Sequence, residues 1–128
     1  MYTDPTKAYN ETKVTSSVSG ASPHKLIELL LDGCMEKLSV AKGSMARGEI
    51  RQKAEAIKKA IDIIVGLQAC LDFEQGGDIA GELDSLYTFC TNRLALANAL
   101  NDSTKIDDAY RVIGTIKAGW IEIGDGRA

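Results

Sequence analysis

Apolar side chains recur at intervals of three and four residues through most of the chain after residue 20. This is the spacing of the buried face of an α-helix, and it predicts four helices, over residues 23–46, 49–71, 79–99 and 104–123. No stretch alternates apolar and polar residues as a half-buried strand does. The pattern therefore predicts an all-α protein.

Short segments rich in helix-ending residues separate the predicted helices. Ser22 is a good N-cap, and Pro23 suits the first helical position. The segment 47–48 ends the first helix, and the sequence DFEQGGD at 72–78, closed by the N-cap candidate Asp78, makes a tight connection before the third. Helices of about 20 residues span about 30 Å, so short connections between them favour an antiparallel up-and-down four-helix bundle.

The first twenty residues are polar and rich in Ser and Thr, with scattered apolar positions such as Tyr2, Tyr9 and Val14. They predict an N-terminal arm or short extra helix over 1–20, ahead of the helical bundle at 21–128. Two interpretations of the arm stay open: it lies over an apolar groove of the bundle, or it is disordered.

Composition narrows the class of protein. The chain has 128 residues, of which 45% are hydrophobic, enough for one compact core. Its formal net charge of −3 provides no basic field, so nucleic acid is not an expected partner. The apolar run 26–31 contains Glu28 and is too short for a membrane span, and residues 1–19 lack a signal-peptide core. We expect a cytosolic protein without membrane insertion.

The second predicted helix carries acidic residues four positions before basic ones. Glu49 precedes Lys53, and Glu55 precedes Lys59, both in the favourable orientation for ion pairs on a helix surface. This pattern indicates that the two pairs lie on a solvent-exposed outer face.

Residues for catalysis or metal binding are scarce. His24 is the only histidine, which excludes a histidine-based catalytic triad and a multi-histidine metal site. Asp72, Glu74 and Asp78 lack the spacing of a calcium-binding loop and are assigned to capping and solvation. The sequence therefore predicts a protein that is not an enzyme and that needs no cofactor and no metal.

The three cysteines, Cys34, Cys70 and Cys90, are widely spaced, and each falls within an apolar helical pattern. They contain no CxxC motif and no Cys/His cluster. We interpret them as reduced core thiols of a cytosolic protein, with a disulfide or metal role as the less favoured alternative.

The first long helix carries an unusually wide apolar surface. Two neighbouring rows make it up: Leu26, Leu30, Cys34 and Leu38 in one, and Ile27, Leu31 and Met35 in the other. An apolar groove usually marks a binding site, whereas a helix with neighbours on both sides buries the same rows in the core. Gly33 and Gly66 allow the same two interpretations, because a glycine lets either a partner segment or a neighbouring helix of the bundle approach the backbone closely. Both interpretations stay open.

Short motifs along nearly the whole chain resemble those of the FliS family, the chaperones that hold flagellin before secretion. The matching segments are Ala8-Tyr9, Ser22-Pro23-His24-Lys25-Leu26-Ile27, Asp32-Gly33, Lys59-Ala60-Ile61-Asp62-Ile63-Ile64, Asp72-Phe73-Glu74, Leu83-Asp84-Ser85-Leu86-Tyr87, Arg93-Leu94, Ala97-Asn98 and Gly119-Trp120. No single segment is diagnostic, but their order and spacing make coincidence implausible. Two positions depart from the family pattern: Leu31 stands where an aromatic residue is common, and Gly119 where alanine is usual.

The resemblance implies a cytoplasmic helical bundle that binds the disordered C-terminal region of flagellin in hydrophobic grooves and prevents its premature polymerisation. It also implies delivery to the flagellar type III export apparatus through the export gate protein FlhA. On this interpretation Tyr9 forms part of a cap that flagellin displaces or keeps nearby. The groove walls are then drawn from Ile27, Leu30, Leu31, Cys34, Met35, Ile57, Ile61 and Ile64.

Three alternatives remain at this point. Each of these apolar residues could equally belong to the core, because core and groove share one periodicity. The chain could be a helical adaptor for another protein. An empty apolar groove could also pair with a second copy, which leaves a homodimer open.

Overall fold

The computed structural model describes residues 22–124, so the predicted arm over 1–20 lies outside the described residues. The described chain forms four helices: α3 (Pro23–Ala46), α4 (Ile50–Ala69), α5 (Phe73–Leu100) and α6 (Ser103–Ile123). They pack against one another, which confirms the predicted all-α class. The bounds of α3 agree with the prediction, and those of α4 and α6 differ from it by one or two residues.

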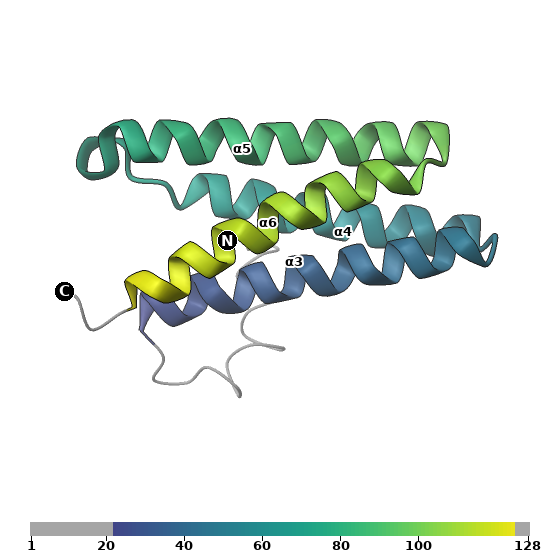
Figure 1. Cartoon of the computed structure of the whole chain (residues 1–128), viewed down its shortest axis with the longest axis horizontal. Helices are drawn as coiled ribbons and strands as arrows, with labels where there is room; N and C mark the ends of the chain where they lie inside the picture. The colour runs from purple at the N-terminus through teal and green to yellow at the C-terminus, as the bar shows by residue number, and fades with distance from the viewer. Residues whose placement is uncertain (1–21, 125–128) are drawn as a thin grey trace, which may run out of the picture.

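The four helices form a ring around one core. α3 packs against α4 and α6, and α5 packs against the same two helices from the other side. Consecutive helices run antiparallel, and α6 crosses the bundle obliquely from the end of α5 to the start of α3 (Figure 1). α3 therefore has neighbours on both flanks, which accounts for the two apolar rows along it.

Local side-chain and backbone chemistry sets the helix ends, and the N-cap of α3 is the one predicted from the sequence. The side chain of Ser22 accepts a hydrogen bond from the backbone nitrogen of Lys25 at 3.1 Å, as an N-cap does. Gly48 takes a φ of 74° in the turn between α3 and α4, a conformation that favours glycine. Asp102 caps α6 by accepting from the backbone nitrogen of Thr104 at 3.0 Å.

The predicted start of the third helix was wrong. α5 begins at Phe73 because the side chain of Asp72 accepts from the backbone nitrogen of Gln75 at 3.0 Å and caps a first turn there. Gly77, with φ 52° and ψ −125°, then kinks the chain before the long part of the helix. The predicted loop is thus a capped helical turn and a glycine kink, and Asp72 rather than Asp78 is the N-cap.

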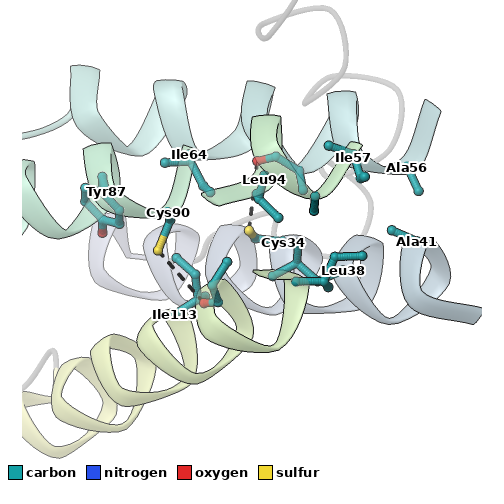
Figure 2. Close-up of a cluster of buried hydrophobic side chains, with 14 of the residues drawn as sticks. Cys34, Leu38, Ala41, Ala56, Ile57, Ile64, Tyr87, Cys90, Leu94 and Ile113 are labelled. Carbon is teal, nitrogen blue, oxygen red and sulfur yellow. Dashed lines mark hydrogen bonds between the residues drawn. The ribbon is translucent and has the colours of Figure 1, made fainter. Parts of the chain in front are cut away.

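The core fills the centre of the ring with aliphatic side chains and two thiols (Figure 2). Cys34 lies 3.9 Å from the carbonyl oxygen of Ala60, and Cys90 lies 3.9 Å from that of Ala109, each with its Sγ directed at the oxygen. Burial raises the pKa of both thiols to about 12, with a smaller effect of Cys90 on Cys34. Both are free core thiols, as predicted, whereas Cys70 is exposed, so the prediction was wrong for that residue.

One lysine also lies inside the bundle. Lys53 is 4% exposed, and its Nζ donates to the carbonyl oxygen of Asn98 at 3.2 Å and to Oδ1 of Asn101 at 3.1 Å. A cation is favourable there because carbonyl groups at the end of a helix lack partners. The predicted surface pair with Glu49 was therefore wrong: Glu49 pairs with Arg47 at 3.1 Å instead.

Candidate protein-binding surface

An apolar pocket of about 360 Å³ opens at the end of the bundle where α3 begins and α6 ends. All four helices contribute to it, together with Leu71 just after α4. Residues that line it include Ile27, Leu67, Leu71, Ile79, Leu83, Ile116 and Trp120. Among the described residues that line the pocket, Glu82 alone carries a charge at neutral pH. This pocket is suited to apolar groups of a ligand or partner.

A row of exposed apolar side chains runs along α5 from the pocket. Leu86, Phe89, Leu96 and Leu100 are 40%, 38%, 43% and 62% exposed, and we call these four residues the α5 stripe. Their separations of three, seven and four residues place them on one flank of the helix. Leu86 also lines the pocket, so pocket and stripe are continuous. The stripe covers residues 86–100, and the 14 rises between its ends correspond to about 21 Å in an α-helix.

The segment of α5 that carries the stripe is almost free of charge. From residue 85 to residue 100 the sequence holds a single charged residue, Arg93. Its guanidinium carbon lies 5.0 Å from the centre of the Phe89 ring, and its Nε lies 3.8 Å from Oδ2 of Asp108 on α6. Arg93 thus lies over one ring of the stripe with its charge paired to Asp108, and the rest of the stripe presents apolar groups to its surroundings.

The structure divides the predicted groove residues into two groups and leaves one outside. Tyr9 lies outside the described residues. Four of the others are at most 2% exposed and belong to the core: Leu31, Cys34, Ile57 and Ile64. The remaining four are partly buried and pack against that core: Ile27, Leu30, Met35 and Ile61. Ile27 and Leu31 line the pocket, and the other six described residues do not.

Contacts along α3 explain the buried group. Met35 approaches α6, where its Cε would lie 3.5 Å from a Cβ built on Gly114. Gly33 faces α4, because a Cβ there would meet Cδ1 of Ile63 at 3.8 Å, an ordinary packing distance. The wide apolar surface of α3 is thus mainly packed between α4 and α6. A bound chain would reach its innermost residues only if the bundle opened.

The candidate surface includes Ile27 and Leu31 of the predicted groove residues, but most of it comes from other residues. The α5 stripe and the pocket residues Ile79 and Trp120 were not among the predicted groove residues. Two signals in the sequence could have found the stripe: the nearly uncharged run 85–100, and apolar residues such as Phe89 and Leu96 that stand off the core-facing row.

Comparisons with known proteins agree with the resemblance noted in the sequence. A family model described as flagellar protein FliS matches residues 5–127. The chain belongs to the FliS family of flagellar secretion chaperones. The FliS of Vibrio cholerae is 44% identical over 117 residues, which cover 91% of this chain and 86% of the relative. FliSB of Pseudomonas aeruginosa is 43% identical over 89% of this chain and 90% of its own length. FliS of Bacillus subtilis is 24% identical over 117 residues, covering 91% of this chain and 84% of the relative.

Membership of the FliS family places the chain among chaperones rather than enzymes. Within residues 22–124, no three His, Cys, Asp or Glu side chains form a group that could hold a metal ion. None of the four described helices contains a stretch long and apolar enough to span a membrane.

Proposed function

We propose that this FliS-family chaperone works in the cytoplasm, where it binds the disordered C-terminal region of flagellin. It prevents premature polymerisation and delivers its client to the flagellar type III export apparatus, with the gate protein FlhA as the receptor. The observation that carries the proposal is the continuous, mainly apolar surface formed by the pocket and the α5 stripe. A surface of this kind suits a client that is partly helical when bound.

The energetics favour a client that uses both parts of this surface. Ordering a disordered segment costs about 2–5 kcal/mol or more. Complete burial of a Leu or Phe side chain contributes about 1.5–3 kcal/mol, so covering the exposed fraction of each stripe residue contributes on the order of 1 kcal/mol. The four side chains together only offset the ordering cost. Net affinity then requires the pocket as well, and we infer that one client chain occupies both.

The residues predicted from the sequence enter this proposal in different roles. Ile27 lines the pocket directly. Leu31, Cys34, Ile57 and Ile64 support the surface from the core, and Leu30, Met35 and Ile61 pack against that core. Tyr9, which lies outside the described residues, serves in this proposal as part of a cap that flagellin displaces or keeps nearby.

A second copy of the chain is a poorer occupant of the stripe. Residue 93 is the midpoint between Leu86 and Leu100. If two stripes paired antiparallel about a twofold axis, Arg93 of each copy would therefore meet its counterpart. Like charges at the centre of an interface oppose association. We therefore favour the client over a homodimer, and sedimentation of the purified chain measures which state is present.

Calorimetric titration of the purified chain with a flagellin C-terminal segment of its own organism tests the proposal, together with circular dichroism. We expect micromolar or tighter binding, a negative heat-capacity change from apolar burial, and a gain of helicity by the segment. No heat and no spectral change would refute the flagellin proposal. They would favour the alternative function, a helical adaptor whose partner is another protein.

A further inference from the structure

We infer that His24 is a positioning residue, which holds Trp120 in place as a wall of the apolar pocket. The two rings are stacked, with centres 4.4 Å apart and planes 9° from parallel. Nε1 of Trp120 also donates a hydrogen bond to the backbone oxygen of His24 at 2.8 Å. The second residue of α3 is thereby joined to the last turns of α6, 96 residues further along the chain.

The same indole belongs to the pocket. Trp120 lines it together with its neighbour Gly119, and a Cβ built on Gly119 would have no atom within 4 Å. Open space at Gly119 means that no side chain braces the indole from that position. The flat ring of His24 and the hydrogen bond to its carbonyl therefore set the orientation of this part of the pocket wall.

The His24 ring is itself held chiefly by this stack. Its Nε2 is buried and has no hydrogen-bond partner among residues 22–124. A buried polar atom without a partner is costly, so it does not anchor the ring. Stacking, which favours aromatic pairs beyond the area that they bury, orients the His24 ring, and it orients the indole together with the hydrogen bond to the His24 carbonyl.

A second contact between the same helices provides a control. Lys117 forms an ion pair with Asp32, so it also joins α6 to α3, but it is a partner neither in the stack nor in the Trp120 hydrogen bond. Lys117→Gln weakens the attachment of the two helices and leaves the stack in place. Comparison of this variant with the His24 variants shows whether His24 acts by positioning Trp120 or only by holding α6 against α3.

The test uses Trp120 as a reporter, since it is the only tryptophan in the chain. In the free protein, His24→Ala should increase quenching of Trp120 fluorescence by acrylamide and lower its anisotropy, because the ring that covers one indole face is gone. His24→Phe keeps a flat ring and the backbone carbonyl, so it should restore both signals. Lys117→Gln should leave both unchanged. Should His24→Ala fail to fold, His24→Leu, which keeps bulk without a flat ring, makes the same test.

The consequence for binding rests on the proposed function. Affinity for the flagellin segment should fall about 2- to 10-fold in His24→Ala, the range for the loss of one aromatic pair, and recover in His24→Phe. Unchanged quenching in His24→Ala, or equal changes in Lys117→Gln, would overturn the positioning role. If the wild-type chain does not bind flagellin, the proposed function fails, while fluorescence of the free protein still decides the role of His24.

Discussion

The outer faces of α4 and α5 differ, although both helices bury their inner faces in the same core. α4 presents charge to its surroundings, as in the exposed pair of Lys58 and Asp62 with Nζ and Oδ2 3.0 Å apart. α5 presents Leu86, Phe89, Leu96 and Leu100. A surface helix of a globular protein is ordinarily charged or polar on its outer face. α4 also exposes Val65, but its outer face carries charged pairs that α5 lacks, and this contrast supports the proposed client site on α5.

Truncation of a core residue on the inner face of α4 or of α5 should cause similar losses of stability, and these are the largest losses we expect. Ile64 on α4 and Leu94 on α5 are both 0% exposed. Truncation of either to alanine should lower the free energy of unfolding by about 2–5 kcal/mol, through lost burial and a residual cavity. Urea denaturation followed by circular dichroism measures this. A loss below 1 kcal/mol at only one of the two sites would show that the two inner faces are not equivalent.

The next largest loss of stability is expected at Lys53, which joins α4 to the end of α5. Lys53→Met should destabilise the fold by about 1–3 kcal/mol, because it leaves the carbonyl oxygen of Asn98 without its charged donor at the end of α5. Lys59 lies on the exposed face of the same helix, and Lys59→Met should change stability by no more than about 0.5 kcal/mol. Equal effects of the two substitutions would contradict an anchoring role for Lys53.

The buried thiols and the exposed thiol should also differ in how they respond to pH. Burial raises the pKa of Cys34 and Cys90 from 9.0 to about 12. Their contribution to stability is complete below pH 9, where the thiols of the unfolded chain are also protonated, and it is lost between pH 9 and 12. A thiol reagent at pH 8 should label exposed Cys70 and leave the other two unmodified in the folded protein. Mass spectrometry of the labelled chain detects any exception.

The smallest effect belongs to the charged face of α4. Lys58→Gln breaks an exposed pair four residues apart, for which about 0.3–0.5 kcal/mol is typical. The loss should disappear at high salt, because exposed charges are screened. A loss above 1 kcal/mol that persists in salt would mean that this face has a structural role beyond solvation.

Local signals in the sequence predicted much of the fold. They failed for features that depend on how distant parts of the chain pack together. Ser22 and Pro23 fixed the start of α3, since N-cap chemistry depends on neighbouring residues alone. The first turn of α5 was missed because Asp72 caps a short helical turn ahead of Gly77, whose non-helical backbone separates that turn from the long part of the helix. Lys53 was assigned to the surface because a spacing of four residues does not reveal that the end of α5 lies beside it.

The candidate surface could be predicted from the sequence less completely than the fold. Leu31 and Ile64 have the periodicity of a groove wall and of a core alike, and only the positions of α4 and α6 around α3 distinguish the two. Trp120 enters the pocket through a contact with His24 that joins opposite ends of the described chain. Contacts of that kind follow from the packing of the helices, which the sequence pattern of one helix does not specify.

The most direct test introduces the same charge on both outer faces and measures flagellin binding by calorimetry. Leu96 on α5 is 43% exposed and Val65 on α4 is 52% exposed, so Leu96→Asp and Val65→Asp are matched substitutions. We expect Leu96→Asp to weaken binding of the flagellin C-terminal segment at least about tenfold, because a carboxylate would be buried under the client. Val65→Asp should bind as the wild type does, and both variants should keep wild-type helicity. Equal affinity of the two variants for the segment would contradict the account.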